Sequence, residues 1–354
     1  MMKIFSLTRM NKGWNEIVKE KVGIKEIAKI SGYSISTVSR VLNGTGKCSR
    51  EAADVIKGVA AECGYKEMMQ GNGLEMKCIA LLLPDISIDF YALFAKQIQS
   101  ELLLQGYYPI LIDLSHSRVS LEESIRMLRA LNVKVAINIC NHMADEDIVK
   151  IGLPMVFVNR NFKSNSGLLS KQRFVSICSD NEESGVIAAE EFYRSGCRKV
   201  TYLSALPMEG WAVSVRRDAF FRRAQELGMS CIPCEPYLNP LTEAQGAFRA
   251  IRSFWDKGNS VDGIFCATDW AAVGALLHMR EAAIRVPEEV QVIGAGAVSD
   301  YPNFFQILTT IKVPVYEMAK EVSNAAISMT NDDTYVPKDI CFPVSLQKGN
   351  TTIR

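Results

Sequence analysis

Beyond residue 77 the chain alternates short apolar runs with longer segments of mixed polarity, and this alternation limits its possible folds more than any other feature. Continuous apolar runs separated by amphipathic helices are typical of parallel sheets that helices cover on both faces. Such strands build one closed barrel or two open sheets, and periodicity does not choose between them. Strands are predicted at 78–83, 109–113, 133–139, 155–159, 174–177, 200–204, 263–267 and 292–295, with helices between them such as 91–104, 182–194, 213–227 and 269–280.

The first part of the chain has a different, wholly helical pattern. Apolar residues recur at helical spacing between Ile24 and Cys63, and Gly32 interrupts the pattern after the first stripe. Ser34 is suited to cap a second helix and Ser49 a third, while Gly64 is suited to end the third. Three short helices with a glycine turn between the first two follow the helix-turn-helix plan.

The second of these helices carries a polar face suited to nucleic acid. The chain as a whole has 40 Lys and Arg against 39 Asp and Glu, so a DNA-binding function has to rest on a local feature. Residues 22–66 contain seven Lys and Arg against four Asp and Glu, an excess of the sign that phosphates require. From the residues alone, the alternative is a small helical cap or protein-interaction module. The polar face consists of Ser36, Thr37, Ser39 and Arg40.

The stretch 22–43, VGIKEIAKISGYSISTVSRVLN, closely resembles the DNA-binding segment of the LacI-type (lactose/galactose repressor) family. The resemblance implies that Ile35 and Ser36 read bases in the major groove and that Arg40 reads a further base, a guanine by a two-pronged contact. It implies that Thr37, Ser39 and Asn43 contact phosphates and that Lys47 lies in a loop that approaches DNA.

The segment that follows departs from the family pattern. The usual Tyr-x-Pro-Asn and its hinge helix are replaced by residues 67–77, which lack the proline and contain two glycines. Two interpretations remain open for 67–77, an atypical helix in the minor groove or a flexible linker. Residues 1–21 precede the family's usual start and are interpreted as an extension outside the folded domains, with Met10 or Val22 as alternative starts.

The resemblance continues to the carboxyl end, through segments such as CATDWAAVG at 266–274 and VPEEVQVIG at 286–294. It implies an α/β fold in which the 22–66 helix-turn-helix domain precedes a periplasmic-binding-protein-like domain, 78–354, with two doubly wound lobes. The expected amino-terminal lobe is 78–178 with 308–333, and the expected carboxyl-terminal lobe is 179–307 with 334–354. A ligand is expected in the cleft at the carboxyl ends of the strands.

The resemblance also implies which residues hold that ligand. Asp269 can accept two hydroxyl hydrogen bonds, although an aspartate at a helix start is also a common N-cap. Arg216 can bridge two ligand oxygens. Asn159 replaces the family's usual aspartate, and less aromatic surface is expected, so the effector is a sugar, a sugar phosphate or a nucleobase. The predicted effector-binding residues are Phe90, Tyr91, Asn159, Arg160, Arg216, Leu241 and Asp269.

Other functions are disfavoured by what the chain lacks. A transport-type binding protein needs a signal peptide and has no helix-turn-helix, and an enzyme on this type of sheet needs a glycine-rich phosphate loop or a nucleophile–base set. The pair Cys231 and Cys234 is interpreted as a strand edge, and the cysteines at 78, 140, 178, 266 and 341 as small buried hydrophobes. We expect a cytoplasmic homodimer without metal, cofactor or membrane span, in which the helices after Ala92 and Thr268 pack across a two-fold axis and which binds operator DNA.

Overall fold

The computed structural model describes residues 23–43, 48–63, 76–114, 121–139, 143–160, 173–205, 210–237, 242–296, 308–335 and 338–353. The chain divides into two compact units, Met1–Met76 and Lys77–Arg354. This division falls within the segment 67–77 that the sequence marks as a linker. The predictions for 1–21, and for the hinge conformation of 67–75, lie outside the described residues.

The described part of the first unit is a bundle of three short helices. They are α2 (Ile24–Ser31), α3 (Ile35–Asn43) and α4 (Arg50–Glu62), and they enclose a core that includes Ile27, Val38 and Ile56. Gly32 ends α2 with a φ of 74°, a left-handed conformation that favours glycine. The predicted caps are confirmed, since Ser34 Oγ accepts a hydrogen bond from Thr37 N (3.1 Å) and Ser49 Oγ accepts one from Ala52 N (3.2 Å).

The described residues of the second unit form two separate six-stranded sheets, so the strands build two open sheets and not one barrel. The first sheet has the order β11-β5-β4-β3-β1-β2, and its paired strands are all parallel. We call this sheet and its helices the first lobe. Its strands are β1 (Cys78–Leu83), β2 (Tyr108–Asp113), β3 (Ala136–Asn138), β4 (Met155–Val158), β5 (Phe174–Ser179) and β11 (Ile340–Phe342).

Helices cover both faces of the first sheet, as its continuously apolar strands require. One core gathers Leu81, Phe94 and Met318 between the sheet and two helices, α5 (Asp89–Leu104) and α12 (Val315–Asn331). The other gathers Ile125, Ile148 and Phe157 between the sheet and two further helices, α6 (Leu121–Ala130) and α7 (Asp145–Ile151).

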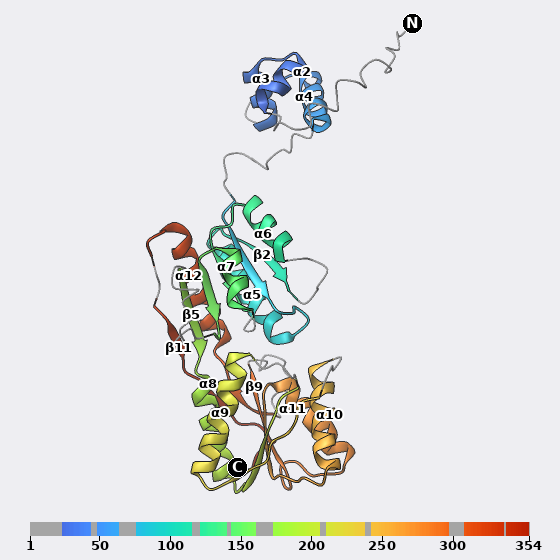
Figure 1. Cartoon of the computed structure of the whole chain (residues 1–354), viewed down its shortest axis with the longest axis vertical. Helices are drawn as coiled ribbons and strands as arrows, with labels where there is room; N and C mark the ends of the chain where they lie inside the picture. The colour runs from blue at the N-terminus through green and yellow to red at the C-terminus, as the bar shows by residue number, and fades with distance from the viewer. Residues whose placement is uncertain are drawn as a thin grey trace. The chain divides into compact units, whose positions relative to one another are not determined.

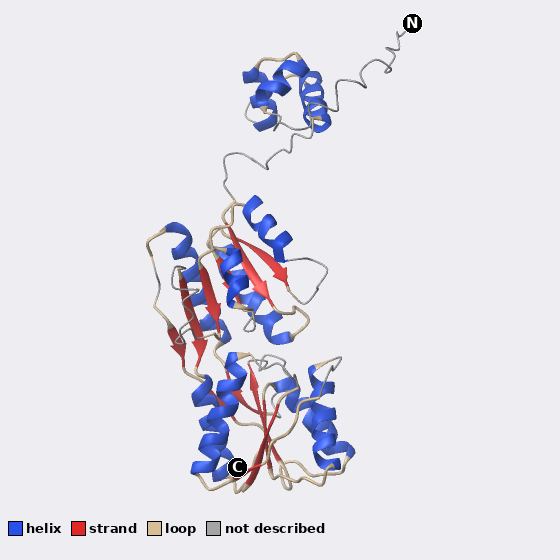
Figure 2. Cartoon of the chain, in the orientation of Figure 1, coloured by secondary structure: helices blue, strands red, loops and turns tan. Residues whose placement is uncertain are grey.

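The second sheet, with its own helices, forms the second lobe. Its strand order is β12-β10-β9-β8-β6-β7, and among the described strands β12 alone runs antiparallel to its neighbour. Figures 1 and 2 show this sheet lying between two helix pairs, α8 with α9 on one face and α10 with α11 on the other. The bounds are β6 (Lys199–Leu203), β7 (Ser230–Cys231), β8 (Gly263–Cys266), β9 (Gln291–Gly296), β10 (Thr309–Lys312), β12 (Ser345–Gln347), α8 (Asn181–Arg194), α9 (Trp211–Glu226), α10 (Glu243–Asp256) and α11 (Asp269–Glu281).

The crossings between the lobes lie later in the chain than the sequence predicts. The expected boundaries assign 308–333 to the first lobe and 334–354 to the second, but β10 pairs with β9 in the second sheet and β11 pairs with β5 in the first. These lobe boundaries were wrong because a short apolar run does not reveal which sheet supplies its hydrogen-bonding partner. The chain crosses after β5, after β10 and after β11, each time from the carboxyl end of a strand.

The two sheets contain several of the cysteines whose surroundings the sequence predicts. Cys231 lies in β7, which is the edge strand of the second sheet, so the strand-edge interpretation is confirmed. Cys78, Cys178 and Cys266 are buried as expected, whereas Cys341 is exposed. The expectation for Cys341 was wrong because β11 is an edge strand. Cys140 lies outside the described residues.

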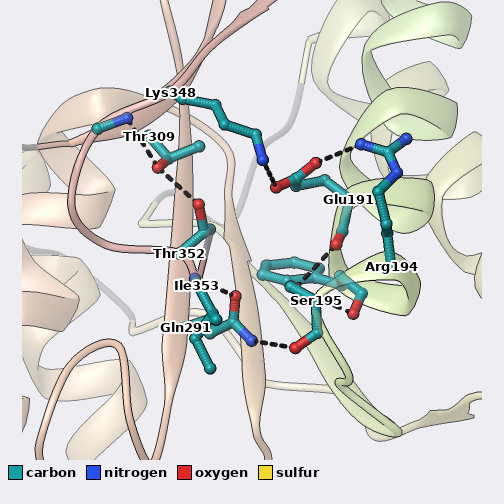
Figure 3. A network of polar contacts seen from close by, with 10 residues as sticks. Glu191, Arg194, Ser195, Gln291, Thr309, Lys348, Thr352 and Ile353 are labelled. Carbon is teal, nitrogen blue, oxygen red and sulfur yellow. Dashed lines mark hydrogen bonds and ion pairs between the residues drawn. The ribbon is translucent and has the colours of Figure 1, made fainter.

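A polar network fixes the end of the chain to the second lobe (Figure 3). The buried carboxylate of Glu191 on α8 pairs with Arg194 (2.7 Å) and with Lys348 (2.9 Å), which follows β12. Gln291 of β9 donates to Ser195 O (3.1 Å) and accepts from Ile353 N (3.0 Å). The last described residues are thereby tied to both α8 and the centre of the sheet.

In the described part of the chain, no helix is long and apolar enough to cross a membrane. No group of three or more His, Cys, Asp or Glu side chains among the same residues is placed to hold a metal ion.

Candidate nucleic-acid interface and ligand site

The face of α3 that points away from the helical core carries the residues predicted to contact DNA. Val38 and Val41 are buried in that core, which fixes the rotation of the helix. Ile35 is 51% exposed, and Ser36 and Arg40 are exposed as well, while Thr37 and Ser39 are half-buried. One helical surface therefore presents an apolar side chain, hydroxyls and a guanidinium, the groups that read base edges and contact phosphates.

The start of α3 is ordered by a small cluster of hydroxyls. Ser34 Oγ lies 2.8 Å from Ser36 Oγ and 2.8 Å from Thr37 Oγ1, in addition to capping the helix. Ser36 is thus held next to the exposed Ile35 at the first turn. Asn43 is the last residue of α3, and Lys47 lies outside the described residues.

In the second unit, Asp269 occupies the first turn of α11, directly after β8. Its side chain is 1% exposed and accepts a short hydrogen bond of 2.5 Å from the Thr310 hydroxyl of β10. The N-cap of α11 is the preceding residue, Thr268, whose Oγ1 accepts from Ala271 N (3.0 Å). The alternative interpretation of Asp269 as the helix cap was therefore wrong, and its carboxylate is directed to the neighbouring strands.

Two glycines of β9 leave room for this carboxylate. A Cβ atom at Gly294 would lie 2.4 Å from Asp269 Oδ1, and one at Gly296 would lie 3.0 Å from Asp269 Oδ2. A Cβ atom essentially never lies within 3.0 Å of a heavy atom beyond its own residue and its two chain neighbours, so Gly294 cannot be replaced without displacing the atoms around it. The Gly-Ala-Gly segment at residues 294–296 therefore shapes the surroundings of Asp269.

Arg216 on α9 reaches the end of β8 from the other face of the sheet. Its guanidinium is buried, donates from Nη1 to Ala267 O (2.6 Å) and from Nη2 to Asn181 Oδ1 (2.8 Å), and its Nε has no hydrogen-bond partner within the described part of the chain. Arg216 and Asp269 thus lie on either side of the residue pair Ala267 and Thr268, at the carboxyl end of one strand.

Hydrogen bonds continue from Arg216 into the first lobe. Asn181 donates from Nδ2 to Ser179 O (2.9 Å), and Asn159 Oδ1 accepts from Ser179 N (2.9 Å) and Ser179 Oγ (3.1 Å). Asn159 adopts a positive φ of 53°, which asparagine tolerates better than most residues. A continuous polar path therefore joins the end of β4 to the end of β8 through the crossing that follows β5.

Comparison with known proteins gives matches over both units. Residues 23–67 match the family model of bacterial regulatory proteins of the lacI family, and residues 189–352 match that of the periplasmic binding protein-like domain. The sucrose operon repressor of Streptococcus mutans serotype c is 25% identical over 337 residues, which cover 93% of this chain and 98% of that protein.

The chain belongs to the LacI family of bacterial regulatory proteins.

Solved structures support the same fold for this LacI-family chain. The lac repressor dimer bound to operator and the anti-inducer ONPF gives a TM-score of 0.67 at 19% identity, covering 95% of this chain and 100% of that one. The transcriptional regulator CelR in complex with cellobiose gives a TM-score of 0.65 at 20% identity, covering 93% and 99%. At these identities the likeness shows the fold, which is the helix-turn-helix and two-lobed architecture that the sequence predicts.

The other predicted ligand residues make contacts within the first lobe or lie outside the described residues. Arg160 donates to Met143 O (2.5 Å) and Asp145 Oδ1 (2.6 Å) at the start of α7, so it connects elements of the first lobe. Phe90 and Tyr91 stand at the start of α5, half-buried against the first-lobe core, with ring centroids 5.5 Å apart. Leu241 lies outside the described residues.

Several residues that complete these contacts are not predicted by the sequence. Thr310 contacts Asp269 across strands that are far apart in the chain, and no local signal announces that contact. Asn181 is not among the predicted ligand residues, yet its amide connects Arg216 to Ser179. Side chains along a strand alternate between the two faces of the sheet. This alternation could have placed Thr310 on the same face as Asp269, but only once the strand order was known.

Proposed function

We propose that this LacI-family chain is a sequence-specific DNA-binding repressor whose affinity for its operator is set by a small molecule bound in the two-lobed unit. The observation that carries the proposal is that one chain joins a helix-turn-helix with an exposed polar face on α3 to two lobes connected at the carboxyl ends of their strands. The relatives named as operon repressors support the same function.

On the DNA side, we assign base reading to the exposed side chains of Ile35, Ser36 and Arg40. A guanidinium can form two hydrogen bonds with the O6 and N7 atoms of guanine, while a serine hydroxyl is compatible with several bases. Thr37, Ser39 and Asn43 are assigned to phosphate contacts, which fix the register of the helix on the duplex without selecting a sequence.

On the ligand side, the chemistry of Asp269 and Arg216 fits a polyhydroxylated molecule. A buried carboxylate is an acceptor for two hydroxyl groups, and a planar guanidinium can contact two oxygens. The names of the similar proteins, a sucrose operon repressor and a cellobiose complex, support a sugar. Sugar phosphates and nucleobases are the competing ligand classes, and we expect binding without chemical conversion.

The mechanism we propose is thermodynamic linkage. A ligand that binds one arrangement of the lobes better than another shifts the chain toward that arrangement, and the arrangement sets the spacing of two DNA-binding units in a dimer. The polar path from Asn159 to Arg216 passes through a crossing between the lobes, so a ligand at Arg216 can act directly on that crossing.

A direct test combines a ligand screen with DNA binding by the full chain. Thermal melting is measured with sugars, sugar phosphates and nucleobases, because a molecule that binds only the folded state raises the melting temperature. Each hit is then added to a titration of labelled DNA from the region upstream of the chain's own gene. A hit that changes the DNA affinity supports the proposal, whereas ligand binding without any DNA binding would overturn it in favour of a solute-binding protein.

A further inference from the structure

Two cysteines from distant parts of the chain are neighbours in the first sheet. Cys178 of β5 and Cys341 of β11 are register partners on adjacent parallel strands. Partners in register point to the same face of a sheet, and adjacent strands lie about 4.8 Å apart. Disulfides form between residues whose Cα atoms are about 4.4–6.8 Å apart, so this separation is within range without a rearrangement of the backbone.

The two thiols differ in exposure, and this difference suits them to react with an oxidant one after the other. Cys341 is exposed on the edge strand, so an oxidant in solution can reach it. Cys178 is buried, with its Sγ 3.2 Å from Ser176 Oγ. Burial raises the pKa of the Cys178 thiol, and the hydrogen bond with Ser176 opposes that rise. Cys341 is therefore suited to react first with the oxidant, and Cys178 to react second.

The pair lies at the point where two strands leave the first lobe. The helix α8 begins at Asn181, three residues after Cys178, and β12 begins at Ser345, four residues after Cys341. Between these crossings, Asp180 N donates to Phe342 O (2.9 Å). A covalent bond here would join two of the three connections between the lobes.

We propose that Cys178 and Cys341 are a disulfide-forming site at the crossing between the lobes, whose oxidation restricts the relative motion of those lobes. The site itself stands independently of the proposed repressor function, and only its effect on DNA binding rests on that function.

The reaction balances with a low-molecular-weight disulfide as the oxidant. The Cys341 thiolate attacks one sulfur of the oxidant, forms a mixed disulfide and releases one thiolate. The Cys178 thiolate then attacks Cys341 Sγ, which forms the Cys178–Cys341 bond and releases the second thiolate. Two protein thiols are oxidised by two electrons, the oxidant is reduced to two thiols, and the two protons pass to the released thiolates.

The test uses the full chain, oxidised glutathione as the probe and peptide mapping without reduction. We expect a crosslinked peptide pair that contains Cys178 and Cys341 and has lost two hydrogen atoms, and that disappears after treatment with dithiothreitol. The Cys48→Ser variant is the matched control, because it removes an exposed thiol of the first unit and should leave the crosslink unchanged. In the Cys178→Ala variant, Cys341 should instead retain glutathione, because the second step cannot occur.

Mapping decides the proposal by itself. Glutathione retained on Cys341 of the unmodified chain, or a crosslink from Cys341 to another cysteine, would overturn it. With the crosslink formed, the melting temperature should rise, since the bond closes a long loop in the unfolded chain. The ligand-driven change in DNA affinity, about 5- to 150-fold for typical allosteric coupling, should fall toward one. Failure to bind DNA in both redox states would count against the repressor function and not against the disulfide.

Discussion

The proposed function rests on a few side chains whose surroundings suit them to different partners. Arg40 and Asp269 illustrate the contrast. Arg40 is exposed on the face of α3 opposite the helical core, whereas Asp269 is 1% exposed next to the end of a strand. Exposure makes Arg40 available to a large rigid partner such as DNA. Burial makes Asp269 available only to a small molecule or to its own neighbours.

Replacing Arg40 should remove selectivity and leave the two lobes unaffected. The Arg40→Ala change should lower affinity for the operator by about 1–3 kcal/mol while affinity for unrelated DNA changes little, because base contacts and not phosphate contacts are lost. Fluorescence anisotropy with operator and scrambled duplexes measures both. Lys57→Ala, which removes an exposed charge on α4, is the control and should affect the two duplexes alike. Unchanged selectivity in Arg40→Ala would remove this residue from base reading.

The close approach of Gly294 to Asp269 predicts how a larger residue at that position affects stability. In Gly294→Ala the new Cβ would lie 2.4 Å from Asp269 Oδ1 and 3.0 Å from Leu308 Cδ2, so the second lobe should lose about 1–3 kcal/mol of unfolding free energy. Urea denaturation measures the loss. Gly58→Ala is the opposite case and should raise the unfolding free energy. Nothing lies within 4 Å of the Cβ that alanine would add, and alanine favours the helix α4 by about 0.5–1 kcal/mol. Equal stability of Gly294→Ala and the unmodified chain would contradict the close packing described.

Among the helices and strands, α11 begins at a capping threonine and carries a buried histidine near its end. His278 is 6% exposed, its ring centroid lies 5.8 Å from that of Phe248 and 5.9 Å from that of Trp255, and neither ring nitrogen has a hydrogen-bond partner in the described ranges. Burial lowers the pKa of His278, and the nearby charges of Glu281, Arg252 and Asp256 partly offset one another.

This histidine predicts how stability depends on pH. Because the pKa of His278 is lower in the folded chain than its ordinary 6.5, the unfolded chain binds the proton more readily. Its contribution to stability is therefore complete above about pH 6.5 and is lost as the pH falls below that value. Urea midpoints should fall between about pH 7.5 and 5.5, and less steeply in His278→Phe than in the unmodified chain. An identical slope in the two proteins would exclude His278 as a source of the pH dependence.

Elements could be predicted from the sequence where the signal is local. The helix caps Ser34 and Ser49 are found as expected, and β9 (Gln291–Gly296) extends the predicted 292–295 by only one residue at each end. The strand expected at 133–139 is limited to Ala136–Asn138, because only these residues pair with β1. The partners of β10 and β11 could not be predicted, since strand pairing depends on contacts between residues distant in the chain. For the same reason Thr310 was missed beside Asp269, although Asp269 itself was predicted.

At the scale of the whole molecule, exposed apolar side chains support the dimer that the proposed mechanism requires. Leu103 and Leu104 of α5 are 47% and 82% exposed, and Tyr108 of the edge strand β2 is 48% exposed. On α11, Leu277 is 50% exposed. These helices are those that follow Ala92 and Thr268, for which the sequence predicts a two-fold interface.

A charge at the most exposed of these positions should therefore prevent assembly. Light scattering should give the Leu104→Glu variant half the molar mass of the unmodified chain, because a carboxylate would lose its water on dimer formation. Tyr193→Glu alters a similarly apolar but separate exposed position on α8, and it should remain dimeric. A dimeric Leu104→Glu variant would place the interface on another face.

Ligand-controlled DNA binding is tested most directly by the operator affinity of the full chain, measured with and without the ligand that the thermal screen identifies. We expect the ligand to change this affinity in the unmodified chain and in Thr268→Ser, which retains the cap of α11. We expect Asp269→Asn to bind operator normally but to respond no longer, because the buried carboxylate proposed to accept the ligand's hydroxyls is gone. An Asp269→Asn variant that responds to the ligand as the unmodified chain does would contradict the proposed role of Asp269 in coupling ligand to DNA.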